Sequence, residues 1–461
     1  MIEEFEYKGI WWLPNKPKEQ ISGVFKFTPN EGAILDLIGS FKDTEPKIIL
    51  GISSDGKKIT LYKCFKTQSN LSILGFSTSS FYANMAFVGI HFQKTEDIKF
   101  KGLSVHYMYL DEWFNISGFV DIQYSSDEKE IVIKYELLKP IQAVINDYKI
   151  FLDIRVTPPT LSIVQKEASI KQMVYIRVES SEEKPFDEYL NIIYLIQNFL
   201  SLGITEPVYP LIVEGKTEMN KKIIKINKET INYYYPPVKV YGALDIPKVP
   251  KTLYPFDMLF TFRDISDKFE FFLKNWLEKA DLLEPVYNLY FETLYSPRIN
   301  LKHKFLSLLQ AIESYHRRTM NNFEQPEKQH KKKIEEILNA VPHKHKDWLK
   351  DKLAYSNEPT LRKRLKDILK KFADVSNKFI SDKKSFVEKV VTTRNYLTHY
   401  DETLKKQSAE GEELYHFTQN IKILLEICLL EELGFTSDNI KNLISNKYRR
   451  YFRTMIVKKL K

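Results

Sequence analysis

The chain has 461 residues, of which 43% are hydrophobic and 28% are charged, with 30 Phe and 27 Tyr. This length and composition argue against global disorder and predict two or three domains with substantial cores. The only two cysteines, Cys64 and Cys428, suggest neither a disulfide framework nor a cysteine metal centre and fit a reducing cytoplasm. No apolar run reaches about 18 residues, so we expect no membrane span and a cytoplasmic location.

The formal net charge of +9 is unevenly distributed. Residues 301–461 contain 34 Lys and Arg against 21 Asp and Glu, whereas residues 1–300 contain 35 against 39. A basic C-terminal third favours a polyanionic partner. A solvated, lysine-rich surface explains the same charge equally well.

Residues 1–180 are predicted to form a β-rich, sandwich-like domain. Two β-rich runs in residues 47–65 flank Asp55-Gly56, a dipeptide that supplies the positive φ values of a tight hairpin turn. More strands follow without long helices between them, which favours a sandwich or a barrel-like domain. These strands are expected within residues 130–138, 147–156, 160–167 and 172–180. Trp11-Trp12 is more typical of a β core than of a ligand-stacking pair.

Residues 181–290 are predicted to be a mixed α/β connecting region, with a helix over 186–203 and a hairpin within 223–242. From about Asp264 the apolar spacing is helical, and residues 291–461 are predicted to form an all-α bundle. The predicted fold class is therefore α+β multidomain. The segment from Glu324 to Lys350 gives the weakest signal.

The stretch VTTRNYLTHYD, residues 391–401, carries the main candidate chemistry. Asn395 and His399 are four residues apart and share a helix face, and the long side chain of Arg394 can converge on the same ligand. Arginine matches phosphate oxygens, and histidine transfers protons near neutral pH. Together they could cleave RNA without a metal, leaving a 2′,3′-cyclic phosphate and a 5′-OH. The spacing alone is a weak signal, because a surface arginine beside a solvated histidine gives the same pattern.

Three stretches together carry a family resemblance. RNYLTHY, expected at the start of a helix, is similar to the R-x4–6-H signature of HEPN nucleases, and LLQAIESYHRR (308–318) resembles the first helix of the ApeA-like HEPN branch. The opening of the chain resembles the ApeA N-terminal domain, with a Trp-Leu-Pro element followed by a spaced run of glycine, phenylalanine, proline and leucine. The run consists of Gly23, Phe27, Pro29, Gly32, Leu35, Leu37 and Gly39.

The resemblance implies an abortive-infection-type antiphage protein whose HEPN domain is a metal-independent endoribonuclease acting on tRNA or other cellular RNA. It implies Arg394, Asn395 and His399 as catalytic residues, with Glu313 as a supporting acid. The alternative for Glu313 is a solvated acid beside Arg317 at i,i+4. A homodimer or higher homo-oligomer is also implied, with no cofactor and no metal. The N-terminal part would sense a phage-derived trigger or restrain the nuclease.

Further RNA-contacting candidates are His316, Arg317, Arg318 and Tyr400, and ordinary surface charge is the alternative for the first three. His343-Lys344-His345 is more typical of a polar loop than of a metal site. The C-terminal segment NKYRRYFRTMIVKKLK either contacts RNA or closes the bundle.

Two rival functions stay open. One is a non-catalytic HEPN module that binds RNA or nucleotides or only dimerises. The other is a ligand- or carbohydrate-binding β domain with a helical dimerisation tail.

Overall fold

The computed structural model describes residues 4–70, 75–124, 130–157, 160–162, 166–226, 230–247, 250–296 and 298–453. The chain forms two compact units. The first, the β unit, comprises residues 1–200, 208–255 and 261–270. The second, the helical unit, comprises residues 201–207, 256–260 and 271–461.

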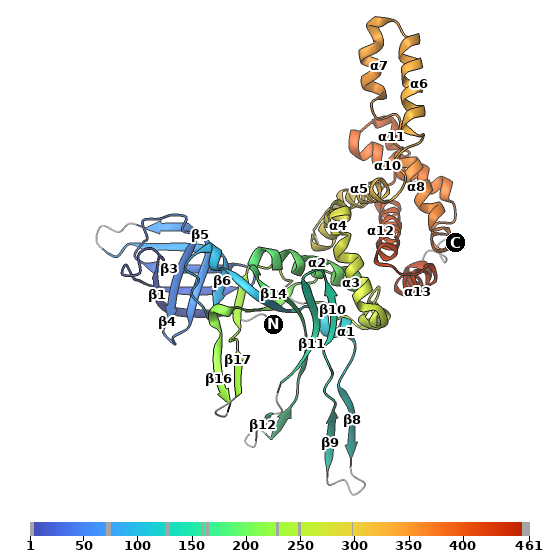
Figure 1. Cartoon of the computed structure of the whole chain (residues 1–461). Helices are drawn as coiled ribbons and strands as arrows, with labels where there is room; N and C mark the ends of the chain where they lie inside the picture. Colours follow the sequence, from blue (N-terminus) through green and yellow to red (C-terminus); the bar gives the residue numbers. More distant parts are fainter. Residues whose placement is uncertain are drawn as a thin grey trace. The chain divides into compact units, whose positions relative to one another are not determined.

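The β unit is built on one antiparallel twelve-stranded sheet with the order β10-β11-β14-β7-β15-β18-β6-β3-β2-β1-β4-β5 (Figure 1). The strands are β1 Phe5–Trp12, β2 Ile21–Thr28, β3 Gly32–Ile38, β4 Ile48–Ser53, β5 Lys58–Asn70, β6 Thr78–Val88, β7 Lys99–Tyr107, β10 Ile141–Ile145, β11 Tyr148–Val156, β14 Gln172–Pro185, β15 Pro210–Lys216 and β18 Val238–Gly242. The sheet thus continues beyond residue 180, because β15 and β18 lie between β7 and β6.

Six of these strands close into a barrel. β5 at the end of the sheet also pairs with β6, with Ile59 opposite Val88 and Leu61 opposite Ala86, so β6-β3-β2-β1-β4-β5 returns to its start. Alternate side chains of each strand fill the interior, as the two-residue period of a strand requires. Of the Trp11-Trp12 pair predicted to anchor a β core, Trp11 lies in this core and is fully buried, whereas Trp12 is half-buried outside it.

The glycines of the N-terminal run have structural reasons in the barrel. Gly32 has a φ of 82° in the turn between β2 and β3, a conformation that other residues rarely adopt. A Cβ at Gly23 would collide with the backbone of Asp36 and the side chain of Leu37 on the paired strand β3. The hairpin predicted at Asp55-Gly56 is confirmed, joining β4 to β5.

Three two-stranded hairpins extend from the sheet of the β unit (Figure 1). They are β8 Phe119–Tyr124 with β9 Ile131–Tyr135, β12 Thr160–Ser162 with β13 Glu167–Ser169, and β16 Lys222–Ile226 with β17 Thr230–Tyr234. The predicted hairpin within residues 223–242 corresponds to β16 and β17, whereas the last part of that stretch, β18, joins the main sheet. A short helix, α1 Leu110–Phe114, and a long one, α2 Phe186–Ile204, complete this part of the chain.

The remaining helices confirm the predicted helical C-terminal region. They are α3 Phe269–Glu278, α4 Ala280–Tyr295, α5 Leu301–Thr319, α6 Glu327–Ala340, α7 Lys346–Leu353, α8 Leu361–Lys371, α9 Ala373–Ser376, α10 Lys383–His399, α11 Glu402–Lys405, α12 Gly411–Leu433 and α13 Ser437–Lys447. α5 packs against α4, α8 and α12, and α10 packs against α8. None of the helices in the described ranges is long and apolar enough to cross a bilayer.

Helix α12 forms the centre of the helical unit and is buried on all sides over residues 420–430. It nevertheless carries Glu426, which is 0% exposed. The carboxylate accepts hydrogen bonds from the hydroxyl groups of Tyr290 at 2.8 Å and Tyr448 at 2.5 Å, and it pairs with Lys422 at 2.8 Å. Burial raises the pKa of both tyrosines well above the ordinary value, so both remain hydrogen-bond donors to the carboxylate. This network satisfies a charge that the core would otherwise not tolerate.

Candidate functional site

The motif of residues 391–401 occupies the last two turns of α10, not the start of a helix as the sequence suggested. The helix begins earlier, where the side chain of Asp382 accepts a hydrogen bond from the backbone N–H of Ser385 at 3.0 Å. It ends at Tyr400, which has a left-handed conformation with a φ of 51°. His399 is therefore the final helical residue, where the partial negative charge of the helix end favours a cation.

Packing fixes the orientation of this helix end. Val390 and Leu397 are buried against the bundle, so the opposite face is turned outward. Thr393 is also buried, and its hydroxyl accepts a hydrogen bond from the backbone N–H of Ala409 at 2.9 Å. That contact ties the segment after α11 to α10.

Arg394 is held by two neighbours. Its guanidinium Nη2 lies 3.8 Å from Glu313 Oε2 on α5, and its Nη1 donates to Asn395 Oδ1 at 3.3 Å. The side chain of Arg394 is 35% exposed and that of Glu313 is 28% exposed. Glu313 and Asn395 thus orient the guanidinium, and part of it remains exposed to solvent. Arg317, the alternative partner proposed for Glu313, instead pairs with Glu358 at 2.7 Å.

His399 is exposed at the same helix end, five residues after Arg394. Asp401 follows it and caps the short helix α11 by accepting hydrogen bonds from the side chain and backbone of Thr403. These hydrogen bonds hold the pKa of Asp401 below its ordinary value, and the charge of His399 acts in the same direction. The imidazole thus has a carboxylate nearby and open solvent beside it, which suits a group that exchanges protons.

His316 is not on the surface, so its predicted role as an RNA contact is wrong. Its side chain is 1% exposed. Nδ1 lies 3.0 Å from Arg364 Nη1 and Nε2 lies 3.3 Å from Asp367 Oδ2. An arginine can only donate, so Nδ1 is the acceptor, and the ring is neutral with its proton on Nε2. Burial lowers the pKa of His316, and the charge of Arg364 adds to this effect.

The buried guanidinium of Arg364 connects this network to the motif. Arg364 is 2% exposed and also lies 3.5 Å from Glu358. Desolvation lowers its pKa, while the carboxylates of Glu358 and Glu313 act in the opposite direction. Sequence reasoning missed Arg364, although one signal was present. It stands four residues before Ile368 on α8, and therefore lies on the apolar face of that helix.

The other predicted RNA contacts are on the surface. Arg317 is exposed in its pair with Glu358, and Arg318 donates to the backbone carbonyls of Asp281 at 3.3 Å and Leu282 at 3.0 Å. Tyr400 is 65% exposed beside the motif. The structure therefore places Tyr400, Arg394, Asn395 and His399 at one helix end. It leaves their roles as predictions.

Two further candidates from the sequence are the His343-Lys344-His345 turn and the C-terminal segment. His343-Lys344-His345 forms an exposed single 3-10 turn between α6 and α7, and among the described residues no group of three or more potential ligands gathers as a metal would require. In the C-terminal segment, Tyr448 is buried and Phe452 stacks on Phe379 at 5.6 Å, so the part up to residue 453 packs on the bundle. Residues 454–461 lie outside the described part of the chain.

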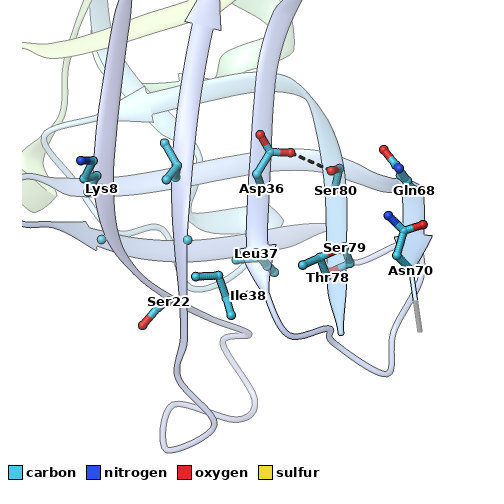
Figure 2. A pocket seen from close by; sticks show the side chains of 13 residues that line it. Lys8, Ser22, Asp36, Leu37, Ile38, Gln68, Asn70, Thr78, Ser79 and Ser80 are labelled. Carbon is cyan, nitrogen blue, oxygen red and sulfur yellow. Dashed lines mark hydrogen bonds between the residues drawn. The ribbon is translucent and has the colours of Figure 1, made fainter. Parts of the chain in front are cut away.

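The β unit has a candidate site of a different kind. A depression of about 560 Å³ lies over β1, β2, β3, β5 and β6 (Figure 2). Asp36 accepts a hydrogen bond from Ser80 at 2.7 Å within it, and Lys8 supplies a cation at one side. The other polar side chains that line it are Ser22, Gln68, Asn70, Thr78 and Ser79. Val24, Leu37 and Ile38 line it as well, so the lining combines apolar surface with a few polar groups, as small-molecule sites commonly do.

Fold and site together define a protein in which a barrel-based β unit precedes a helical unit with an Arg-x4-His helix end. The family model for ApeA N-terminal domain 1 matches residues 6–276, and the model for Apea-like HEPN matches residues 306–439. The chain belongs to the ApeA family. HEPN domains are generally ribonucleases, and the architecture indicates antiphage defence with a HEPN nuclease module. No match to a curated protein or to a solved structure was found.

Proposed function

We propose that the protein is a metal-independent endoribonuclease of antiphage defence, with Arg394 and His399 as the catalytic pair. The observation that carries the proposal is the exposed helix end of α10, where a guanidinium braced by Glu313 and an imidazole stand five residues apart. The family match supports it, because it covers this helix with an HEPN domain. The substrate would be tRNA or another cellular RNA.

In the proposed reaction, the ribose 2′-OH attacks the adjacent phosphorus while His399 accepts the hydroxyl proton. The bond from phosphorus to the 5′-oxygen breaks, and the imidazolium returns the proton to that leaving oxygen. Arg394 donates hydrogen bonds to the phosphate oxygens as negative charge builds up on them. Asn395 adds a polar contact at the same edge. The products are a 2′,3′-cyclic phosphate and a 5′-OH, without net consumption of a proton.

Glu313 acts here as a positioning residue. Its carboxylate on α5 lies 3.8 Å from the guanidinium of Arg394, and in this proposal it orients the arginine and does not touch the RNA. In this proposal Tyr400, exposed and adjacent to His399, contacts a base or a sugar of the bound RNA.

We further propose that the protein acts in the cytoplasm as a homodimer or higher homo-oligomer through its HEPN domain. In this proposal, the β unit senses a phage-derived trigger or restrains the nuclease. The charge asymmetry supports restraint, since residues 1–300 are mildly acidic and residues 301–461 are basic. In this proposal the depression on the barrel is the place where the trigger binds.

The test compares full-length wild type with His399→Ala and Arg394→Ala on total cellular RNA in EDTA, with and without a lysate of phage-infected cells. Two matched controls are available. His303 is an exposed histidine on α5, and Arg362 pairs with a glutamate at 3.8 Å, the same distance as in the Arg394 pair. Cleavage by wild type, His303→Ala and Arg362→Ala, but not by the two site variants, is the expected result. RNA binding without cleavage by any form in either condition would instead favour a non-catalytic module.

A further inference from the structure

Helices α6 and α7 form an arm, defined here as residues 327–353, that extends from the rest of the helical unit (Figure 1). The two helices pack against each other, and neither contains a buried residue. Ile334, Ile337 and Leu338 are half-buried along the inner side of α6. These apolar residues therefore pack between the two helices of the arm, and the outer faces of the helices are exposed to solvent.

The charges of the arm are concentrated near its root, where α6 begins and α7 ends. Residues 327–333 and 350–353 together contain six lysines and two acidic residues, whereas the outer residues 334–349 contain two lysines and three acidic residues. The lysines of the root half are Lys328, Lys331, Lys332, Lys333, Lys350 and Lys352. Within the described stretch 324–358, Lys331 is the one lysine in an ion pair, with Glu327 at 2.7 Å.

Large aromatic side chains are exposed next to these lysines, one at the inner edge of the outer residues and two flanking the arm. Trp348 on α7 is 62% exposed, and Lys352 stands four residues later on the same helix face. Phe323 and Tyr355, just before and just after the arm, are 53% and 78% exposed. Exposed rings interleaved with lysines are the composition of surfaces that bind unpaired nucleotides, because each base can stack while its phosphate is neutralised.

The root of the arm is fixed next to the catalytic candidate. Gln325 and Asn357 exchange two hydrogen bonds of 3.0 Å, which close the base of the arm. The following residue, Glu358, pairs with Arg317 of α5 and lies 3.5 Å from the buried Arg364. One turn before Arg317 on α5 is Glu313, the partner of Arg394. The root of the arm and the motif are thus connected through α5, which contacts Glu358 through Arg317 and Arg394 through Glu313.

We propose that the arm is an RNA-docking element whose root half, together with the adjacent Trp348, holds unpaired nucleotides of the substrate for the site at the end of α10. The proposal rests on the proposed ribonuclease function and assigns it a substrate class, RNA with an accessible single-stranded loop. Trp348 stacks on a base, and the lysines of α6 and α7 contact the flanking phosphates. A second copy of the chain is a poorer occupant, because two root halves of the same charge would repel each other.

The test measures RNA binding in full-length protein carrying His399→Ala, so that the RNA stays intact. The probe is a fluorescein-labelled RNA stem-loop, titrated at several KCl concentrations. One variant adds Lys328→Ala, Lys332→Ala and Lys350→Ala. Its matched control adds Lys302→Ala, Lys370→Ala and Lys384→Ala, three exposed lysines of α5, α8 and α10. A second pair compares Trp348→Ala with Trp348→Phe, which keeps an aromatic face.

In a plot of the logarithm of the RNA association constant against the logarithm of the salt concentration, the arm lysine variant is expected to make the negative slope shallower by about 2, at roughly 0.7 per lost phosphate contact. The control variant should leave the slope unchanged. Trp348→Ala should weaken binding by about 5- to 100-fold, and Trp348→Phe should retain most of the affinity. Equal affinity and slope in all variants would overturn the proposal. So would unchanged RNA binding with an altered sedimentation coefficient, which would make the arm an assembly surface.

The proposal and the proposed function fail in different ways. If the arm variants lose RNA but wild type never cleaves in EDTA, docking stands and the nuclease mechanism fails. If wild type cleaves through His399 and Arg394 while the arm variants bind and cleave normally, the nuclease stands and the docking proposal is overturned.

Discussion

Replacing Glu313 with glutamine tests whether α5 positions the catalytic arginine. At 3.8 Å, Coulomb's law gives the pair about 1 kcal/mol in water and about 4 kcal/mol at an effective dielectric constant of 20. Because the two side chains are 35% and 28% exposed, solvent screening reduces the net contribution to stability to about 1 kcal/mol or less. Glu313→Gln should therefore fold normally and lower the midpoint of thermal unfolding only slightly.

The effect on cleavage should be larger than the effect on stability. Without the carboxylate, the guanidinium of Arg394 is free to leave the orientation that faces the phosphate. We expect the single-turnover rate to fall by about 10- to 100-fold, the range typical for the loss of an orienting contact. Arg394→Ala removes the donors themselves and should cost about 100- to 1,000-fold. Because Glu313 acts through Arg394, adding Glu313→Gln to Arg394→Ala should have little further effect.

The assay is single-turnover cleavage of a defined RNA, with Glu388→Gln as the control. Glu388 lies on α10 six residues before Arg394 and pairs with Arg362 of α8 at the same 3.8 Å, and its variant should cleave at the wild-type rate. A wild-type rate for Glu313→Gln would refute the positioning role. A further loss of rate in the Arg394→Ala background would show that Glu313 acts independently of the arginine.

Three other predictions concern the framework of the two units. Glu426→Ala should lower the free energy of unfolding in urea by about 3–5 kcal/mol, because it leaves the neighbouring buried lysine without its counter-charge; a loss below about 1 kcal/mol would contradict the buried network. Burial lowers the pKa of His316 in the folded protein below its ordinary value of 6.5. Between pH 6.5 and the folded-state pKa, the unfolded chain therefore binds a proton that the folded protein does not bind, and falling pH favours unfolding. The stability advantage of wild type over His316→Gln should therefore shrink between pH 7.5 and pH 5 in thermal unfolding, and a pH-independent difference would count against it. Gly51→Ala would place a Cβ against the ring of Trp11 and should destabilise the barrel by about 1–3 kcal/mol, whereas Gly56→Asn, in an open turn with positive φ, should be tolerated. Equal stability of the two glycine variants in urea would show that the barrel core accommodates an extra methyl group at position 51 without loss of stability.

Local features of the sequence predicted much of the fold. The Asp55-Gly56 turn and the apolar spacing of α5 depend on neighbouring residues, and both are present in the structure. Closure of the barrel could not be predicted in this way. It depends on β6 pairing with β3, about 50 residues earlier, as well as with its neighbour in sequence, β5, and on β1 pairing with β4. The insertion of β15 and β18 into the sheet is non-local for the same reason.

The candidate site was predictable in its residues but not in its surroundings. The helical period placed Asn395 and His399 on one face, yet the helix start was misjudged because the capping Asp382 lies nine residues before the quoted motif. The basic run around His316 indicated a surface. His316 is buried instead, because Arg364 on another helix donates a hydrogen bond to its ring Nδ1. A contact between side chains 48 residues apart leaves no periodic signal in the sequence.

The most direct test of the nuclease mechanism is the chemistry of the RNA ends that the full-length protein produces in EDTA. The account predicts 2′,3′-cyclic phosphates and 5′-hydroxyls at every cut, dependent on both Arg394 and His399. Such ends require attack by the neighbouring 2′-OH, so an RNA with 2′-O-methyl groups should not be cut at the modified positions. Ends with 3′-hydroxyls and 5′-phosphates, or cleavage that survives His399→Ala, would contradict it.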